Sequence, residues 1–480
     1  MSKVVLLAPP YLDLYGKISS AAGRYFPLGL AYIASYLRKY GGHEVWMYEP
    51  EAQGLSYDDI RGIIREKAPD VIGFTSSTPN FSRAVELARI CREESKARIV
   101  LGGVHASAIP EFIIGSYPDC FDCVVVGEGE QTMLELVDAF RDGRPLAGIK
   151  GIVYMDGGRT ARTEPRPLLD ELDTLPHPAR DLIDQGLFAP NAHNARYRKC
   201  QTILTSRGCP FNCSFCAARI VSGKKYRMHS AEYVLDEMRT LKRTYGTRQL
   251  VITDDTFTLN RERLEKICRG MIDGRLDLAW FCFSQVTAVD RETLKLMKRA
   301  GCYTIGFGVE SAEKDILRKM GKNINPEQAV EAVHIANEVG LKTQAFYVLG
   351  TPGETLEQME HTIRFSLEVD STLAFFNMLV PYPGTRDFNY FFSDVSLKDI
   401  RWDDFVAIGE NCVLTKNATV SKEDVERLIA KASKLYYSDP RRLLRILWHI
   451  RTTYELSNYL SGGLGFVKQI GAWVNKKAGG

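Results

Sequence analysis

Two successive series of alternating apolar and amphipathic segments constrain the fold of this chain more than any other feature. In residues 1–145, short apolar runs separated by amphipathic stretches predict strands that alternate with helices. Five such strands are typical of a doubly wound, flavodoxin-like (Rossmann-type) α/β domain, whose ligands bind beyond the carboxyl ends of the strands. The expected strands are Val4–Ala8, Glu44–Tyr48, Val71–Thr75, Ile99–Leu101 and Cys123–Val126, and the expected helices are Leu28–Lys39, Tyr57–Glu66, Phe81–Glu94 and Gln131–Phe140.

The second series, within residues 196–385, predicts a partial (β/α)6 barrel of the TIM type. Six apolar runs are followed by helical segments, and Ser230, Asn260, Asp290 and Asn325 are residues that start helices well. In such barrels the active site lies on the loops that follow the strands. The expected strands are Thr202–Thr205, Leu250–Thr253, Trp280–Ser284, Thr304–Gly308, Thr343–Leu349 and Ala374–Val380.

Two regions lie outside these series. Residues 146–195 contain Gly157-Gly158 and several prolines, so we expect a linker there. Residues 386–480 are expected to form a helical C-terminal region, in which a basic amphipathic helix includes Arg441 and Trp448. That helix is better explained as a cap on the barrel with solvated arginines than as a contact with a membrane or a lipid-like substrate. Its helical segments are expected at Lys422–Tyr437, Arg441–Tyr459 and Leu464–Val474.

The composition excludes several classes of protein. The chain has 480 residues, too many for one ordinary core, and its net charge of +3 indicates no nucleic-acid partner. No apolar run reaches the length of about eighteen residues that predicts a transmembrane segment, and the N-terminal apolar run ends at Pro9-Pro10. We therefore expect a buried strand there and a cytoplasmic protein. Eleven cysteines, an odd number over a long chain, argue against a secreted disulfide framework.

Three of the cysteines are crowded into one segment that follows the first barrel strand. Cys209, Cys213 and Cys216 lie in the sequence SRGCPFNCSFC. Thiolates at this spacing bind iron, and a cubane cluster held by three cysteines leaves one iron open to another ligand. A structural zinc site would need a nearer fourth ligand than His229, and a redox pair at Cys213 and Cys216 belongs to a different fold.

These cysteines, together with Phe215, match the pattern CxxxCxΦC, where Φ is aromatic. In this the segment resembles the radical SAM superfamily. The resemblance implies a [4Fe–4S] cluster whose fourth iron is chelated by the amino and carboxylate groups of S-adenosylmethionine (SAM). It also implies reductive cleavage of SAM to methionine and a 5′-deoxyadenosyl radical.

Acidic residues at two strand ends resemble positions at which the superfamily contacts SAM. Asp254 and Asp255 follow the second strand and are expected near the SAM amino group, although a pair of helix-capping carboxylates is equally compatible. Glu310 leaves a buried strand, where a carboxylate needs a partner. It is expected either to contact SAM or to pair with an Arg or Lys of the barrel.

Further positions complete the predicted SAM site. Ser284 ends the third strand and is expected to contact SAM, whereas Gln285 stands where related sequences often carry Arg. Gly350 is expected to let the backbone approach the adenine, although glycine could equally serve the turn. Gln344 and Tyr347 lie on the preceding strand and are expected to face the barrel interior.

The strand ends of the first series carry small and hydroxyl residues that suit a bulky ligand. Pro9-Pro10 and Gly102-Gly103-x-His105-Ala106 resemble the cobalamin-binding domain that precedes many radical SAM enzymes. The loop that starts at Tyr11 lacks the His of the DxHxxG pattern, so it supplies no axial His to cobalt. His105 is slightly better explained as a structural histidine. The expected cobalamin-binding residues are Ser76, Thr78, Gly102, Gly103, His105, Gly127 and Glu128.

Both resemblances together imply a cobalamin-dependent radical SAM methyltransferase that acts on an unactivated carbon of a small-molecule or lipid-like substrate. An external electron donor such as flavodoxin or ferredoxin is expected. A radical SAM cyclase or rearrangement enzyme of the same architecture is the main alternative, because the resemblance to the anaerobic magnesium-protoporphyrin monomethyl ester cyclases is comparable. A non-enzymatic cobalamin carrier is disfavoured by the three crowded cysteines.

Overall fold

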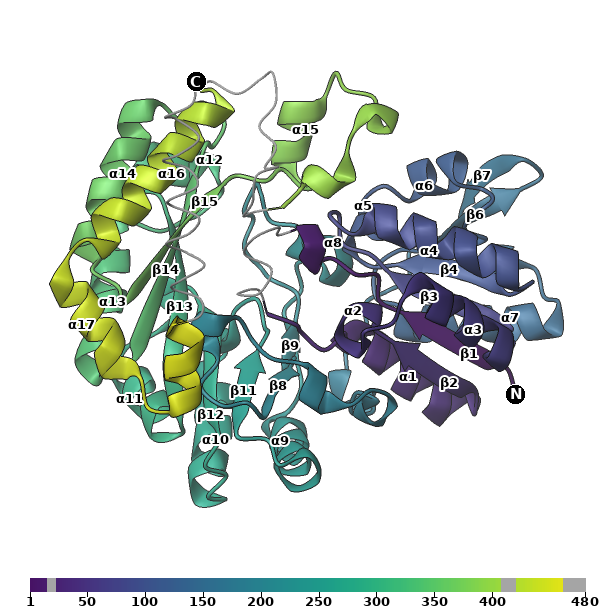
Figure 1. Cartoon of the computed structure of the whole chain (residues 1–480), viewed down its shortest axis with the longest axis horizontal. Helices are drawn as coiled ribbons and strands as arrows, with labels where there is room; N and C mark the ends of the chain where they lie inside the picture. Colours follow the sequence, from purple (N-terminus) through teal and green to yellow (C-terminus); the bar gives the residue numbers. More distant parts are fainter. Residues whose placement is uncertain (15–22, 407–419, 461–480) are drawn as a thin grey trace.

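The computed structural model describes residues 1–14, 23–406 and 420–460. Two α/β bodies lie side by side, the N-terminal one in purple and blue and the other in teal and green (Figure 1). In the N-terminal body the strands pair in parallel in the order β2-β1-β3-β4-β5. This is the predicted flavodoxin-like order. Its strands are β1 (Lys3–Leu7), β2 (Glu44–Tyr48), β3 (Val71–Thr75), β4 (Arg98–Gly102) and β5 (Cys123–Val125).

Helices cover both faces of this sheet, because alternate residues of each strand point to opposite sides. Val4 and Leu6 pack with α1 and α7, whereas Val5 and Leu7 pack with α3, α4 and α6. Each strand is therefore buried on both faces, as the continuous apolar runs predicted. The helices are α1 (Leu28–Gly41), α2 (Pro50–Gln53), α3 (Tyr57–Lys67), α4 (Phe81–Glu94), α5 (Val104–Ala108), α6 (Pro110–Ser116) and α7 (Glu130–Asp142).

The segment expected as a linker contains two more strands of this sheet. β6 (Ile152–Asp156) pairs antiparallel with β5, and β7 (Arg159–Arg162) pairs antiparallel with β6. Gly157 and Gly158 form the two-residue turn between them, with φ of 53° and 81°. Hairpin turns of this kind need positive φ at both positions, which glycine adopts without strain. The Gly-Gly pair therefore marked a hairpin, and the linker expectation was wrong for this part of the segment.

The second body is an open barrel of six parallel strands in the order β8-β11-β12-β13-β14-β15. The helices that connect the strands lie outside it (Figure 1). Asn325 caps α13 with Pro326 in the first turn, and Ser230, Asn260 and Asp290 cap α9, α10 and α11 as predicted. The strands are β8 (Cys200–Ile203), β11 (Gln249–Ile252), β12 (Ala279–Ser284), β13 (Cys302–Glu310), β14 (Lys342–Leu349) and β15 (Leu373–Met378). The helices are α9 (Ala231–Tyr245), α10 (Arg261–Asp273), α11 (Arg291–Arg299), α12 (Lys314–Lys319), α13 (Pro326–Val339) and α14 (Leu356–Val369).

The two faces of β14 differ. Phe346 stacks on Phe375 inside the barrel, with ring centroids 5.1 Å apart, and Gln344 shares its side of the strand. Tyr347 stacks on Phe376 and is buried with α16 (Lys422–Tyr437) on the outer side. The expectation that Tyr347 faces the interior was therefore wrong. Two residues three positions apart on one strand cannot share a face.

The amino ends of the barrel strands are closed by segments from both ends of the barrel sequence. Lys342 begins β14, is fully buried, and donates hydrogen bonds to His193 O (2.6 Å) and Tyr459 Oη (3.2 Å). Glu455 lies 3.9 Å from Lys342 and 3.4 Å from Arg196. Burial lowers the pKa of Lys342 to about 7. We call this end the base of the barrel.

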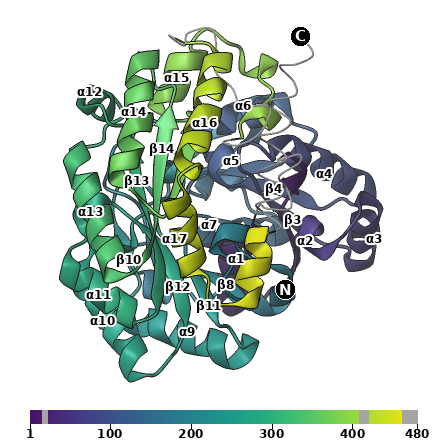
Figure 2. The same cartoon turned by 60° about the vertical axis from the view of Figure 1, so that its left-hand side comes forward.

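The C-terminal region is helical where the structure describes it. α15 (Arg386–Phe392) follows the barrel, and α16 (Lys422–Tyr437) packs on β15 and α14 along the open edge (Figure 2). The helix expected over Arg441–Tyr459 is interrupted. α17 (Pro440–His449) ends before Ile450, and a further helical turn begins at Thr453. The expected segment Leu464–Val474 lies outside the described residues.

Candidate cluster and cofactor site

The three crowded cysteines lie on a loop that is closed by a short ladder. Ser206–Arg207 (β9) pairs antiparallel with Arg227–Met228 (β10), so the segment between them projects from the carboxyl end of β8. Gly208 turns the chain into this loop with φ of 82°, and a Cβ atom there would lie 2.2 Å from Lys225 O. Only glycine satisfies both the conformation and the close approach. We call residues 208–226 the thiol loop; it includes α8 (Ala218–Ser222).

The middle of the thiol loop is fixed to two other elements. Ser214 N donates to Met320 O over 2.7 Å, at the end of α12. The Ser214 hydroxyl donates to Asp387 in α15 over 3.0 Å. Gly321 packs so closely on Asn212 O that a Cβ atom would lie 2.2 Å away. The positions of Cys213 and Cys216 are therefore set by the barrel and not by the loop alone.

The three thiols are half-buried, carry no disulfide, and influence one another electrostatically. Burial raises the pKa of Cys213 to about 11 and raises that of Cys209 and Cys216. Among the described residues no group of three Cys, His, Asp or Glu side chains forms a single-ion site. Sulfurs around one zinc lie about 3.8 Å apart. A cluster instead places each thiolate on a different iron, so this donor set fits a [4Fe–4S] cluster.

His229 does not complete a zinc site. It is buried, its Nδ1 lies 3.0 Å from Asp173, and its ring stacks on Tyr233 with centroids 3.9 Å apart. Burial lowers its pKa to about 4, so the ring is neutral at physiological pH. These contacts give His229 a structural role.

The two aspartates after β11 have different environments. Asp254 is buried and accepts hydrogen bonds from Thr205 N (2.6 Å), the Thr205 hydroxyl (2.5 Å) and the Ser206 hydroxyl (2.5 Å). Arg263 lies 3.6 Å away. The side chain of Asp255 is exposed, has no hydrogen-bond partner among the described residues, and lies near enough to Cys209 and Cys216 to affect their pKa. Its own pKa is raised by partial burial and by Asp254, so a cationic ligand would be stabilised there.

Ser284 and Glu310, the predicted SAM contacts on β12 and β13, already have protein partners. The Ser284 hydroxyl lies 2.6 Å from Thr258 Oγ1 and donates to Gln285 O. Glu310 pairs with Lys322 over 2.7 Å, and both side chains are buried. Lys322 also donates to Gly308 O over 2.9 Å. Of the two expectations for Glu310, the structure shows the ion pair with a barrel lysine. No motif in the sequence signalled Lys322.

Gln344 and Gly350 occupy opposite ends of β14. Gln344 is buried in the barrel interior and donates to Asn194 Oδ1 over 2.5 Å. It therefore lies toward the base, two residues from Lys342 on the same face of the strand. Gly350 lies at the carboxyl end with φ of 87°, and its N–H donates to Glu354 over 2.9 Å. The positive φ of this turn accounts for the glycine, and Gly350 itself is buried.

In the N-terminal domain, the loops at the carboxyl ends of β3 and β4 lie beside the thiol loop. We call their residues Ser76, Thr78, Gly102 and Gly103 the ledge. Gly103 has φ of 98°, and a Cβ there would lie 2.5 Å from Ser76 O, so packing alone requires this glycine. Gly102 is different, because a Cβ would meet nothing closer than 3.8 Å and the φ is ordinary. A glycine that the protein itself does not need fits a position approached by a bulky ligand such as cobalamin. Ser76 and Thr78 are buried next to it.

His105 belongs to an aromatic cluster. Its Nδ1 lies 3.2 Å from Thr78 Oγ1, and its ring contacts Phe81 and Trp402 with centroids 4.4 and 4.8 Å away. Burial lowers its pKa to about 3. These contacts are those of a packed aromatic ring, while its buried Nε2 has no hydrogen-bond partner among the described residues. Trp402 comes from the C-terminal region, which therefore contacts the N-terminal domain.

Glu128, predicted to contact a cofactor, forms ion pairs that join the two domains. It accepts two hydrogen bonds from Arg227, and Arg207 lies 3.5 Å away. Arg207 also pairs with Glu130 over 2.6 Å. All four side chains are nearly inaccessible to solvent. Gly127 supports the same contact, because its N–H donates to Ser107 and α8 lies beside it. The sequence Gly127-Glu128 after β5 did not indicate that Arg227 is the partner of Glu128.

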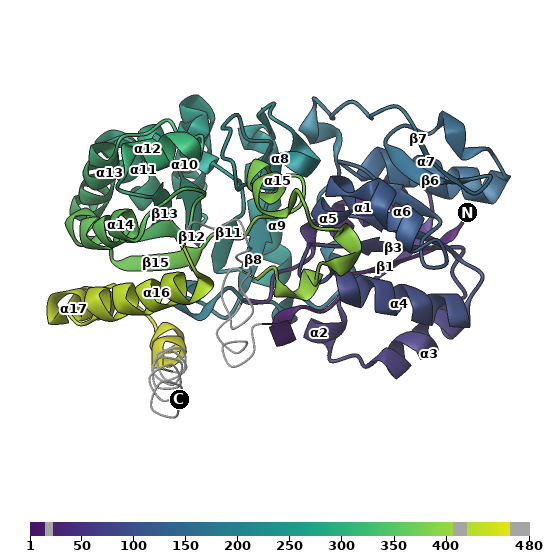
Figure 3. The ribbon, with the colours of Figure 1, turned by 90° about the horizontal axis from the view of Figure 1, so that it is seen from above.

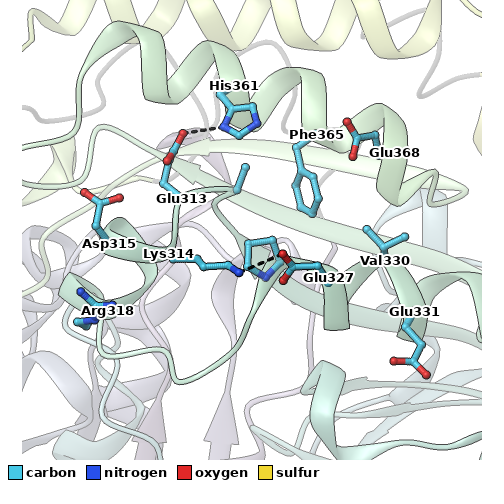
Figure 4. A pocket seen from close by; sticks show the side chains of 12 residues that line it. Glu313, Lys314, Asp315, Arg318, Glu327, Val330, Glu331, His361, Phe365 and Glu368 are labelled. Carbon is cyan, nitrogen blue, oxygen red and sulfur yellow. Dashed lines mark hydrogen bonds and ion pairs between the residues drawn. The ribbon is translucent and has the colours of Figure 1, made fainter.

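A separate hollow of about 860 Å³ lies between α12, α13 and α14. Figure 4 shows its ion pairs, Glu313 with His361 (2.7 Å) and Lys314 with Glu327 (3.1 Å). None of the residues predicted to bind a cofactor lines it. The chemistry of the chain is therefore placed at the thiol loop and the ledge, not here.

Comparisons with known proteins agree with this arrangement. The family model of the radical SAM superfamily matches residues 203–366, and that of the B12 binding domain matches residues 17–137. An uncharacterised methyltransferase of Pyrococcus horikoshii is 36% identical over 444 residues, which cover 92% of this chain and 94% of that protein. The anaerobic magnesium-protoporphyrin IX monomethyl ester cyclase of Rubrivivax gelatinosus is 28% identical, covering 84% of this chain and 72% of its own.

Solved structures show the same fold. The radical SAM methyltransferase TsrM from Kitasatospora setae, with cobalamin and a [4Fe–4S] cluster bound, superposes with a TM-score of 0.66 at 23% identity. The match covers 80% of this chain and 74% of TsrM. The cobalamin-dependent SAM radical enzyme OxsB gives a TM-score of 0.71 at 17% identity, over 96% of this chain and 72% of OxsB.

Proposed function

Because this chain belongs to the cobalamin-dependent radical SAM enzymes, we propose that it methylates an unactivated carbon of a small-molecule or lipid-like substrate. Its cofactors are a [4Fe–4S] cluster, SAM and cobalamin. When bound, they supply the electron that cleaves SAM, the radical that abstracts hydrogen, and the carrier of the methyl group. The similarity to the methyltransferase of P. horikoshii supports methyl transfer.

One observation carries the proposal. α8, which begins two residues after Cys216, packs against α5, which follows the ledge at Gly102 and Gly103. The loop that would hold the cluster and the loops that would hold cobalamin are thus adjacent, as Figure 1 shows around α8. A radical formed at one cofactor must reach a substrate that also reaches the other, and adjacency is what this requires.

The residues of the chain have separable roles in this proposal. Cys209, Cys213 and Cys216 would bind iron, and Asp255 would accept hydrogen bonds from the SAM ammonium group. Asp254 would hold the β8 end in place without touching SAM, because its carboxylate is already bonded. The pairs of Glu128 and Glu130 with Arg227 and Arg207 would fix the distance between the two cofactors. An external one-electron donor such as flavodoxin or ferredoxin would reduce the cluster.

A second candidate, oxidative ring formation, is favoured by the similarity to the magnesium-protoporphyrin ester cyclase. One experiment separates the two. Anaerobically reconstituted enzyme is incubated with methyl-¹⁴C-labelled SAM, a reductant and a small-molecule extract. Methylation predicts label in an extracted compound together with S-adenosylhomocysteine and 5′-deoxyadenosine. Cyclisation predicts 5′-deoxyadenosine and a changed product without label. The cysteine-to-alanine variant described below is the control for non-enzymatic label.

A further inference from the structure

Helix α17 presents its apolar side to solvent. Leu444, Leu447 and Trp448 are 65%, 57% and 73% exposed, and Leu443 beside them is 46% exposed. Arg442 and Ile446 lie on the opposite side of the helix and are buried against the barrel. Ordinary surface helices have the reverse orientation. Of the arginines expected to be solvated, Arg441 and Arg451 are exposed, but Arg442 is buried and the leucines share the exposed face.

Ion pairs hold α17 in this orientation. Arg442 lies 3.1 Å from Asp370 and 3.3 Å from Asp439, and donates to Leu367 O. Arg445 donates to both Asp370 O and Asp370 Oδ2 over 2.6 Å. Turning the helix so that its leucines faced the barrel would break all of these contacts. The ion pairs of Arg442 and Arg445 on the inner side therefore keep the apolar side of α17 toward solvent.

Exposed apolar side chains are concentrated in this part of the molecule. Of the thirteen large apolar residues that are exposed among the described residues, seven come from α16 or from the chain that follows it. Figure 3 shows α17 at the end of α16, on the outer edge of the barrel and away from the N-terminal domain. A concentration of this kind marks a surface that another body covers. The seven residues are Leu435, Leu443, Leu444, Leu447, Trp448, Leu456 and Leu460.

The charge of the same segment indicates what covers it. In the described residues 440–460, four arginines stand against a single acidic residue, Glu455. Arg441, Arg442 and Arg445 pair with Asp439 or Asp370, whereas Arg451 forms no ion pair among the described residues. Glu455 is buried at the base of the barrel and does not offset the surface charge. Arg451 lies against the Trp448 ring, 5.9 Å from its centroid. Cations beside exposed Leu and Trp are typical of helices that lie in the interface of an anionic bilayer.

A hollow next to Trp448 adds to the cationic side of this surface. It has a volume of about 590 Å³, and four cationic side chains line it against two acidic ones. Two of the cationic residues, Arg445 and Arg451, are on or directly after α17. The hollow could accept a phosphate-bearing headgroup while the leucines contact acyl chains. Its charged lining residues are Arg196, Lys298, Arg445, Arg451, Glu338 and Asp370.

We propose that α17, with Arg451 beside it, forms a peripheral binding surface for an anionic lipid bilayer. Among the described residues no helix is long and apolar enough to cross a membrane, so the attachment is to the surface. A second copy of the chain fits less well, because pairing the same surface twice would bring the two excesses of positive charge together. The proposal does not depend on the reaction that the enzyme catalyses.

The test is flotation of the full-length protein with vesicles. We expect the wild type to float with vesicles of phosphatidylcholine and phosphatidylglycerol (7:3) and not with phosphatidylcholine alone. The double variant Leu444→Glu, Leu447→Glu should bind roughly tenfold more weakly, since it places two charges on the apolar face. Both positions are exposed, so the fold should be retained. Leu356→Glu, at an exposed position in the first turn of α14, is the matched control and should float like the wild type.

Three outcomes would overturn the proposal. The first is no flotation of the wild type with either vesicle. The second is flotation that the double variant does not reduce. The third is a wild-type dimer in sedimentation velocity that the double variant converts to monomer without any effect on vesicles, which would assign the surface to a second copy.

Discussion

Glu128 and Arg227 form a two-point ion pair across the boundary between the N-terminal domain and the barrel, with Oε1–Nη2 and Oε2–Nη1 distances of 2.7 and 2.9 Å. Arg227 lies on the ladder that closes the thiol loop. The pair therefore links the strand-end loops of one domain directly to the base of the loop that carries the cysteines.

Glu128→Gln should destabilise the protein by about 3 kcal/mol, because it leaves the Arg227 charge buried without its carboxylate partner. Urea unfolding at neutral pH measures the change. Glu93→Gln removes one carboxylate of the exposed Arg61–Glu93 pair and is the control, with no measurable loss expected. Equal stability of Glu128→Gln and wild type would show that the interdomain pair adds nothing.

The triple variant Cys209→Ala, Cys213→Ala, Cys216→Ala should contain no iron or acid-labile sulfide after anaerobic reconstitution, and it should form no 5′-deoxyadenosine from SAM. The physical reason is that only thiolates at these positions can bind the cluster irons. The control is Cys200→Ala, which changes a buried cysteine at the start of β8, the barrel strand that precedes the thiol loop. This variant should retain iron and sulfide. A triple variant that still cleaves SAM would refute the assignment of the cluster.

Asp254→Asn should affect stability, whereas Asp255→Asn should affect SAM binding. Asp255→Asn should raise the Kd for SAM roughly tenfold, as expected for the loss of one charge-assisted hydrogen bond, and should leave Tm unchanged. Asp254→Asn should lower Tm, because Asp254 joins Thr205 and Ser206 in the core. Equilibrium dialysis and thermal unfolding distinguish them. An unchanged Kd in Asp255→Asn would exclude this residue from the SAM site.

Glu354 should make the stability depend on pH. Burial raises its pKa from 4.5 to about 7, so the folded state holds the proton more tightly than the unfolded chain. Its contribution is complete below pH 4.5 and is lost as the pH rises through 7. Relative to Glu354→Gln, the wild type should therefore lose about 3 kcal/mol between pH 4.5 and pH 8. Urea unfolding across this range measures it.

The control for this titration is Glu357→Gln, which changes an exposed acid in the first turn of the same helix. We expect its difference from the wild type to be the same at both ends of the pH range. If the difference in unfolding free energy between Glu354→Gln and the wild type were also the same at both pH values, the proton on Glu354 would not be linked to folding.

The fold could be read from the sequence because apolar periodicity is a local signal that tertiary packing reinforces. β2, β3 and α4 occur at the residues predicted, and the radical SAM barrel and cobalamin-binding domain are confirmed. Gly157-Gly158 was misread because glycine pairs occur both in linkers and in hairpin turns. Distinguishing the two requires the partner strand β5, thirty residues earlier in the chain.

The site was less accessible to sequence reasoning, and the reason is physical. A motif identified the three cysteines, because their spacing itself carries the chemistry. For Asp254, Ser284, Glu310 and Glu128 the residue type is known but the partner is not, and the partners come from distant segments. Only the structure could separate Asp255, which is open to a ligand, from Asp254, which is not.

The base of the barrel has a consequence for how the chain is made. Lys342 is closed in by Tyr459, which follows it by 117 residues. At ribosomal rates of about 5–20 residues per second, Tyr459 is synthesised roughly 6 to 23 seconds after Lys342. The four barrel strands that precede β14 already exist when this interval begins and β15 is added during it, but the lysine does not yet have both Glu455 and Tyr459 beside it. The nascent barrel therefore stays open at its base until Tyr459 has been synthesised, and the base is sealed only after all six barrel strands exist.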